Sequence, residues 1–275
     1  TDAMTMEGVG KGYSVTESSV LAVKAGADII LKPSDPTVAI DAVLAAVERG
    51  EISRARIDSA ARRVLELKAR TGVAFNPIVD LDALREVVGS REHRAVAADI
   101  AARAITLLRD NGSLLPATGQ RVMVVQYMPE TELRAGKVFG GDIRAAISGA
   151  QVLKISPATS VSDLDSITRQ LARADRVIIA AYVRRIEGSG RPAVPPHIAK
   201  WIDDVAKKHK VIAVALGNPY LIRQFPNVGT YLVTYGVSDA LEHAAAAVVL
   251  GKAPATGTTP VSLPGFFKRG DGLRR

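Results

Sequence analysis

The sequence contains no cysteine, which excludes disulfide bonds, thiolate zinc sites and cysteine nucleophiles. It has no apolar run close to the roughly 20 residues that a membrane-spanning helix needs, and it does not begin with a basic segment followed by an apolar one. We therefore predict neither a membrane span nor a signal peptide in this segment. Because Thr1 already lies inside a motif, Thr1–Gly8, we expect further sequence upstream. Localisation therefore stays open between extracytoplasmic and cytoplasmic.

A basic stripe is also missing. The net charge is +8, but the 36 Lys and Arg residues are interspersed with 28 Asp and Glu residues, so no nucleic-acid partner is predicted. The densest basic cluster, 207–210, precedes an apolar run, and we interpret it as a solvated helix end rather than a phosphate site. Four widely separated histidines favour surface or helix positions over a metal site: His93, His197, His209 and His243. We expect no metal and no organic cofactor.

What is present is typical of a folded α/β protein. With 275 residues, of which 47% are hydrophobic, the chain is long enough for about two domains. In the first segment, 1–72, the apolar run Ala27–Leu31 predicts a buried parallel strand. Asp35-Pro36 predicts the start of a helix that Gly50 ends, and Ser53 predicts the cap of another helix.

The second segment, 73–110, predicts a linker and a connecting helix over about 91–108. The third segment, 111–275, alternates helical stretches with β-like runs rich in β-branched residues, which indicates a mostly parallel sheet covered on both faces, a doubly wound α/β sandwich. Gly140-Gly141 is interpreted as a turn rather than a phosphate-binding loop, because no strand precedes it. The five β-like runs are Val122–Gln126, Val152–Ile155, Val177–Tyr182, Val211–Leu216 and Tyr231–Thr234.

The pattern of 1–72 also matches the last unit of a (β/α)8 barrel. A barrel needs eight strands and roughly 200 to 250 residues. The segment therefore predicts either the C-terminal remnant of a barrel in a longer protein or an accessory to the sandwich.

Six pieces of the sequence, in order, resemble glycoside hydrolase family 3. Thr1–Gly8 resembles the family's nucleophile motif at the end of the seventh barrel strand, and Ala25–Pro33 resembles the eighth strand. Further similar pieces lie at 40–70, 104–110, 216–220 and 260–264. The resemblance covers essentially the whole chain.

The resemblance implies that Asp2 is the nucleophile of a retaining glycosidase; the alternative interpretation is a disordered N-terminal residue or a helix cap. In the family's N-acetylhexosaminidase branch the acid is a histidine paired with an aspartate on an upstream loop. In its glucosidase branch the acid is a glutamate of the sandwich domain, for which Glu187 is the candidate here, with a solvated loop glutamate as the alternative. Residues near the expected rim that would contact sugar are Met4, Lys11, Tyr13 and Lys32.

These inferences predict a carbohydrate substrate. The leading hypothesis is a retaining hydrolase that removes β-linked N-acetylhexosamine from peptidoglycan or chitin-type oligosaccharides through a covalent glycosyl-aspartate intermediate. A β-glucosidase of the same family and a non-catalytic carbohydrate-binding or interaction module are the alternatives. The chain by itself is expected to show no turnover, because a general acid, subsite walls and a closed barrel are not supplied. Its oligomeric state stays open.

Overall fold

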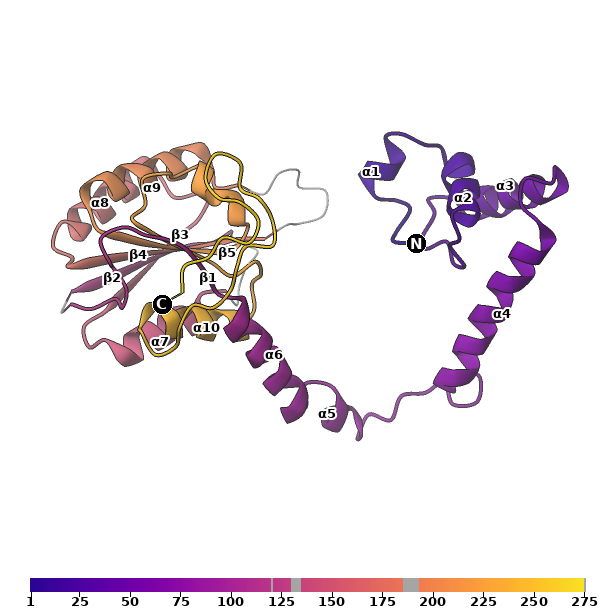
Figure 1. Ribbon diagram of the computed structural model, residues 1–275, viewed down its shortest axis with the longest axis horizontal. Coiled ribbons are helices and arrows are strands. Elements are labelled where there is room, and N and C mark those ends of the chain that lie inside the picture. Colours follow the sequence, from indigo (N-terminus) through magenta and orange to yellow (C-terminus); the bar gives the residue numbers. More distant parts are fainter. Residues whose placement is uncertain (120, 130–134, 185–192, 275) are drawn as a thin grey trace. The chain divides into compact units, whose positions relative to one another are not determined.

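A computed structural model describes residues 1–119, 121–129, 135–184 and 193–274 (Figure 1). The chain forms two compact units, Thr1–Val88 and Gly89–Arg275. The division between them falls inside the segment 73–110 that the sequence predicts to be a linker and connecting helix.

Helices dominate the first unit, and local capping explains where they begin. Ser14 and Glu17 form a reciprocal capping box, and the Asp35 side chain accepts hydrogen bonds from two backbone amides of the next helix. The helices predicted after Asp35 and Ser53 are confirmed, and Gly72, at φ 71°, ends the second of them. The helices are α1 (Glu7–Gly10), α2 (Val15–Lys24), α3 (Pro36–Glu48), α4 (Arg54–Thr71) and α5 (Leu84–Val87).

The prediction of a strand at Ala27–Leu31 is wrong as stated. Only Leu31 pairs with another segment, in one parallel bridge to Ala3. A β-strand needs hydrogen bonds to a neighbouring strand along its length. Within the described chain, the Ala27–Leu31 segment makes a few such bonds, at Ile29 and Leu31, with Thr1–Met4. The assignment of this unit to a barrel therefore remains a prediction.

The second unit is built on a six-stranded sheet of order β1-β6-β5-β4-β2-β3, in which only β1 runs antiparallel to its neighbour. The prediction of a mixed α/β fold with a mostly parallel sheet is confirmed. All five predicted β-like runs are strands. The strands are β1 (Thr106–Asp110), β2 (Val122–Tyr127), β3 (Gln151–Ile155), β4 (Arg176–Val183), β5 (Val211–Gly217) and β6 (Thr230–Val233).

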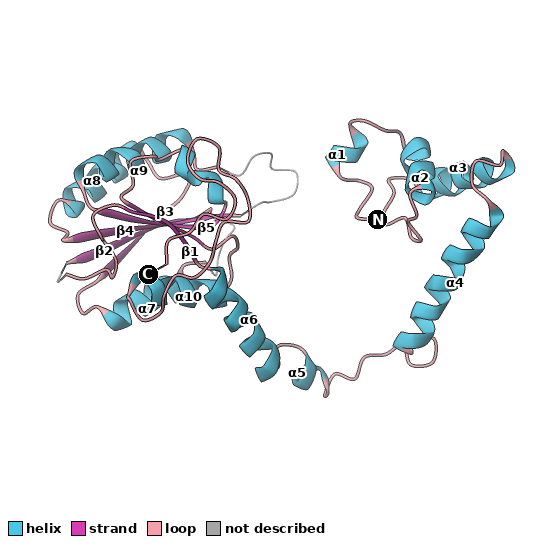
Figure 2. Cartoon of the chain, in the orientation of Figure 1, coloured by secondary structure: helices cyan, strands magenta, loops and turns pink. Residues whose placement is uncertain are grey.

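Helices cover both faces of this sheet (Figure 2). One face packs on α8 and α9, and the other on α7 and α10. The central strands are buried almost throughout, as expected for parallel strands between two helical layers. The elements that complete the unit are α6 (Arg91–Ala104), α7 (Lys137–Ala146), α8 (Val161–Leu171), α9 (Pro196–Lys208), α10 (Asp239–Val249) and the 3₁₀ helix η1 (Pro219–Arg223).

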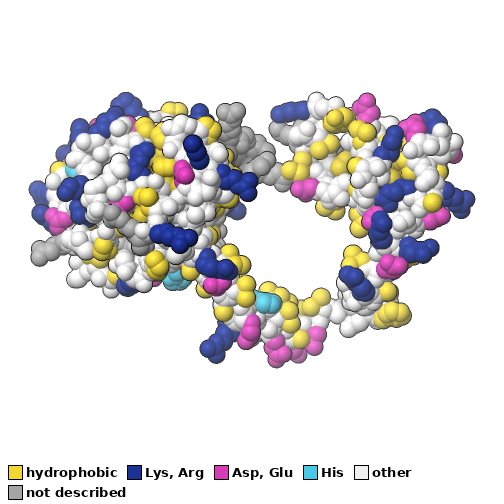
Figure 3. All heavy atoms as spheres, in the orientation of Figure 1, with side chains coloured by type: hydrophobic (Ala, Val, Ile, Leu, Met, Phe, Trp, Pro, Cys, Tyr) yellow, Lys and Arg dark blue, Asp and Glu magenta, His cyan; other side chains and the backbone are white. Residues whose placement is uncertain are grey.

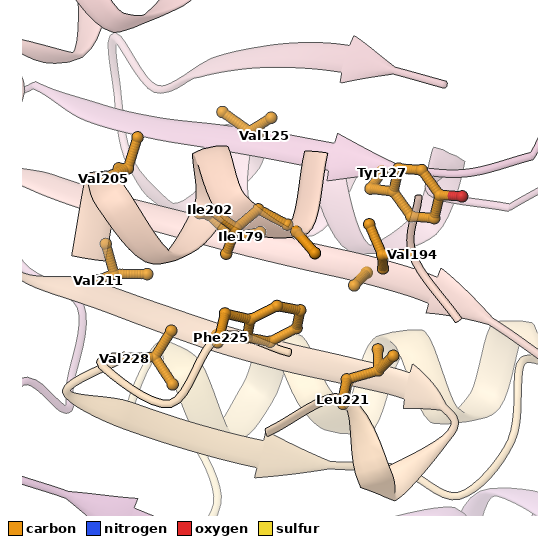
Figure 4. Close-up of a cluster of buried hydrophobic side chains, with 14 of the residues drawn as sticks. Val125, Tyr127, Ile179, Val194, Ile202, Val205, Val211, Leu221, Phe225 and Val228 are labelled. Atoms are coloured by element: carbon orange, nitrogen blue, oxygen red, sulfur yellow. The ribbon is translucent and has the colours of Figure 1, made fainter. Parts of the chain in front are cut away.

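Figure 4 shows part of the core on the α9 face, where side chains of β2, β4 and β5 meet those of α9 and of the segment around η1. Phe225 is 1% exposed and lies in this cluster with Leu221 and Val228, which follow β5. Burying such side chains contributes roughly 1.5 to 3 kcal/mol each. The core thus fixes η1 against the sheet, at the end of β5.

Two local predictions were wrong in this unit. The helix expected over 91–108 ends at Ala104, because Thr106–Asp110 pairs with β6 as an edge strand. Gly140-Gly141 is not a turn but lies inside α7, whose packing against α10 and the sheet offsets the low helix propensity of glycine.

The outer edge of β1 is covered by the C-terminal segment. Leu273 donates its backbone N–H to Leu107, and Gly257 donates to Ile105. A Cβ at Gly257 would lie 2.5 Å from Oγ1 of Thr106, so the close approach requires glycine there. The segment thus satisfies backbone groups that an open edge strand would expose.

Candidate active site

The N-terminal residues lie alongside the segment that follows α2. The backbone nitrogen of Thr1 donates to the carbonyl of Ile29 at 2.9 Å, and Oγ1 of Thr1 accepts from the N–H of Leu31 at 2.9 Å. Met4 donates its backbone N–H to Leu31, also at 2.9 Å. These three bonds fix the backbone on both sides of Asp2.

Asp2 itself is exposed. Its Oδ1 accepts a 2.7 Å hydrogen bond from the backbone N–H of Ala3, which limits the rotation of the side chain. Ala3 is partly buried, and successive side chains of an extended segment point to opposite sides. The carboxylate is therefore presented to solvent beside the end of the Ala27–Leu31 segment, where the sequence places it.

Lys32 follows that segment with a backbone φ of 48°. A residue with a Cβ adopts this left-handed conformation at a cost of the order of 1 to 3 kcal/mol, and such strain concentrates at functional sites. The backbone hydrogen bond between Met4 and Leu31 joins two segments. One carries Asp2 and Met4, and the other ends beside Lys32; Met4 and Lys32 are two of the residues predicted to contact sugar. Met4 is partly buried and Lys32 is exposed.

Lys11 and Tyr13 lie in the turn between α1 and α2. The backbone N–H of Tyr13 donates to the carbonyl of Val9 at 3.1 Å, and its side chain is 54% exposed. Both residues are accessible from solvent. Their contact with a sugar stays a prediction.

A clamp that the sequence interpretation missed holds the Ala27–Leu31 segment. Nη1 of Arg56 lies 2.9 Å from the Asp28 carboxylate, and Nη2 of Arg56 donates to the carbonyl of Ala27 at 2.8 Å. Arg63 adds a second ion pair to Asp28 at 3.0 Å. Burial alone would raise the pKa of the Asp28 carboxyl, but the hydrogen bonds from both arginines outweigh it, and the pKa lies below its usual value.

The sequence also offered a candidate acid and four histidines in the second unit. Glu187, the candidate sandwich-domain acid, lies outside the described residues. The four histidines lie on helices or at a helix end; the imidazole of His243 is 2.6 Å from the Asp142 carboxylate. In the described ranges no three His, Asp or Glu side chains gather as metal ligands would.

Charged side chains of both signs are mixed on the surface. On the face shown in Figure 3, Lys and Arg side chains are spread over both units and mixed with acids, without a continuous stripe. No helix within the described part of the chain has the length and apolar character needed to cross a bilayer.

Comparison with known proteins shows similarity to one family. Residues 1–67, which include Asp2 and the Asp28 clamp, match the family described as Glycosyl hydrolase family 3 N terminal domain. A beta-N-acetylglucosaminidase/beta-glucosidase of Cellulomonas fimi is 25% identical over 283 residues, which cover 95% of this chain and 48% of the relative. The chain is similar to proteins of glycoside hydrolase family 3.

Other family 3 proteins are similar over the same extent. Beta-hexosaminidase A of Pseudoalteromonas piscicida is 24% identical, over 96% of this chain and 49% of its own length. The structure of a family 3 beta-N-acetylglucosaminidase from Paenibacillus sp. str. FPU-7 matches with a TM-score of 0.71 and 27% identity, covering 94% of this chain and 49% of that one. The chain thus spans about half the length of these family 3 proteins.

Proposed function

We propose that the protein containing this chain is a retaining glycosidase in which Asp2 is the nucleophile. The observation that carries the proposal is the exposed Asp2 carboxylate, held beside Leu31 within a segment that matches the family 3 N-terminal domain. The surrounding backbone hydrogen bonds and the clamp on Asp28 hold the backbone that carries this carboxylate. Such preorganisation is what a nucleophile needs to meet an anomeric carbon at the correct angle.

The proposed reaction has two steps. In the first, an oxygen of Asp2 attacks the anomeric carbon, the glycosidic C–O bond breaks, and a general acid protonates the departing oxygen. In the second, water attacks the same carbon as the former acid removes its proton, and the ester bond to Asp2 breaks. The configuration at the anomeric carbon is retained because it inverts twice.

We further propose that the substrate is a β-linked N-acetylhexosaminide of the peptidoglycan or chitin type. The supporting observation is that two curated relatives that match about 95% of this chain, and a solved structure that is 27% identical to it, are named for N-acetylglucosaminidase or hexosaminidase activity. The Cellulomonas fimi relative is also named as a beta-glucosidase, so cleavage of β-glucosides, with Glu187 as the acid, is the second candidate.

The test is made on the whole protein that contains these residues. We expect the wild type to hydrolyse 4-nitrophenyl N-acetyl-β-glucosaminide faster than the corresponding β-glucoside. Asp2→Asn should lower kcat/KM by about 10³-fold or more, as loss of a covalent nucleophile does, and Asp41→Asn, an exposed change on α3, should not alter it.

A mechanism-based 2-fluoro-glycosyl inhibitor should add one sugar to the peptide that contains Asp2, as measured by mass spectrometry. Labelling of a different carboxylate would overturn the assignment of Asp2. Faster hydrolysis of the glucoside would favour the second candidate. Saturable sugar binding without turnover by the whole protein would show a non-catalytic binding module instead.

A further inference from the structure

A pocket of about 720 Å³ lies in the second unit, at the carboxyl ends of β4, β5 and β6. Arg184 directly follows β4, Gly217 ends β5, and Tyr235 comes two residues after β6. In open α/β sheets ligands bind outside the carboxyl ends of the parallel strands. The residues that carry the argument are Arg184, Gly217, Asn218, Tyr220, Arg223 and Tyr235.

The base of the pocket is held by a close contact between two strand ends. Gly217 has φ 107°, and a Cβ at this position would lie 2.3 Å from the carbonyl oxygen of Val183. The backbone N–H of Asn218 donates to that same carbonyl at 2.7 Å. Only glycine permits this approach, which places the turn into η1 against the end of β4.

The wall formed by η1 is fixed from several directions. The Asn218 side chain accepts from the N–H of Tyr220, and the Tyr231 hydroxyl donates to the carbonyl of Pro219. Burial raises the pKa of Tyr231, so its hydroxyl keeps the proton that it donates. Gln224 exchanges two hydrogen bonds with the backbone of Val194. The wall is therefore preformed rather than assembled on binding.

Another lining residue, Tyr235, has a strained backbone. Tyr235 has φ 59°, a rare value for a residue with a large side chain. Its hydroxyl is buried without a hydrogen-bond partner among the described residues. Strained backbone conformations cluster at ligand-binding positions, and a buried hydroxyl without a protein partner is open to a hydrogen bond from a water molecule or a ligand.

The charge of the lining defines the ligand chemistry. Two guanidinium groups, Arg184 and Arg223, line the pocket, and none of its described lining residues is acidic. Arg223 is exposed and makes no ion pair within the described part of the chain. Guanidinium groups bind carboxylates through paired N–H donors, and the rings of Tyr220 and Tyr235 add apolar surface. We propose that this pocket binds a small carboxylate with a ring-shaped body, such as a uronic acid.

The test uses binding without turnover, so its failure is distinguishable from failure of the glycosidase proposal. D-Glucuronate and D-glucose, which differ at a single carboxylate, are titrated into the wild-type chain by calorimetry. We expect glucuronate to bind about tenfold more tightly, the value of one charged hydrogen bond. Arg223→Gln should remove this preference, as measured by the ratio of the two dissociation constants.

Arg173→Gln is the matched control, because Arg173 is also exposed and lies after α8, away from this pocket's lining. It should leave the preference intact. Equal affinity for the two sugars, or equal losses in both variants, would overturn the proposal. Inorganic phosphate that displaces glucuronate at equal concentration would also overturn it, because the pocket would then be a general anion site.

Discussion

Asp28 accepts a 2.9 Å hydrogen bond from Arg56, which stands 28 residues further along the chain. Through this contact α4 holds the segment that in turn holds Thr1–Met4 by backbone hydrogen bonds. The position of the Asp2 carboxylate thus depends on a pair of residues that touches neither Asp2 nor, in the proposed mechanism, the sugar.

The first prediction concerns the pH dependence of this pair. The pKa of Asp28 is lower in the folded protein than its ordinary value of 3.8. A lowered carboxyl pKa stabilises the fold above the unfolded value, and this contribution is lost as the pH falls through the folded value. We expect Asp28→Asn to lower the free energy of unfolding at pH 7, measured by urea denaturation, and to have a diminishing effect below about pH 4. Asp41→Asn, exposed on α3, is the control; an equal effect of both changes at pH 7 would contradict the argument.

The second prediction compares two glycine-to-alanine changes. Gly217→Ala places a Cβ against the Val183 carbonyl at a positive φ and should destabilise the protein by roughly 3 kcal/mol. Gly141→Ala lies in α7 with nothing within 4 Å of the new Cβ, and should stabilise by about 0.5 to 1 kcal/mol. Thermal unfolding should therefore shift in opposite directions for the two variants. Unchanged or raised thermal stability of Gly217→Ala would show that the close strand contact is not tight in solution.

The third prediction concerns Glu242, which is 1% exposed on α10 and accepts hydrogen bonds from the backbone of Gly136 and Phe139 at the start of α7. Glu242→Ala leaves both buried N–H groups unsatisfied and should cost about 2 to 4 kcal/mol of unfolding free energy. Glu242→Gln retains one acceptor oxygen and should cost less. Arg144→Ala, an exposed change on α7, should stay within about 0.5 kcal/mol of wild type. Equal stability of the alanine variant and wild type would refute the capping role.

The fourth prediction concerns catalysis. Residues 1–275 alone should not hydrolyse 4-nitrophenyl N-acetyl-β-glucosaminide, because the proposed acid of the hexosaminidase branch is not among them and Asp2 alone cannot protonate the leaving oxygen. The whole protein should do so under the same conditions. Turnover by residues 1–275 that Asp2→Asn abolishes would show that the chain carries its own acid, and Glu187→Gln would then be the first variant to measure.

Buried parallel strands could be predicted well from the sequence. β2, β4 and β5 are nearly continuous apolar runs because both of their faces are covered, and such runs differ clearly from the helices between them. β1 could not be found in this way. Thr106–Asp110 follows α6 without a glycine or proline, and it is a strand because it pairs with residues 230–233, which no local pattern reveals.

Part of the candidate site could likewise be predicted from the sequence, and part could not. The family resemblance placed Asp2 beside the Ala27–Leu31 segment, and the hydrogen bonds of Thr1 and Met4 agree with that position. The Asp28 clamp comes from residues on α4, and the pocket beside η1 requires three strands to end together. These arrangements depend on tertiary packing, so single-sequence reasoning supplied no signal for them.

The pairing of β1 with β6 has a consequence for how the protein is made. Thr106 meets Val233, so one strand leaves the ribosome more than a hundred residues before its partner exists. At translation rates of about 5 to 20 residues per second, β1 waits on the order of 10 seconds with its hydrogen-bonding groups unpaired. During synthesis the backbone N–H and C=O groups of this short strand are therefore open to other partners until residues 230–233 have been made.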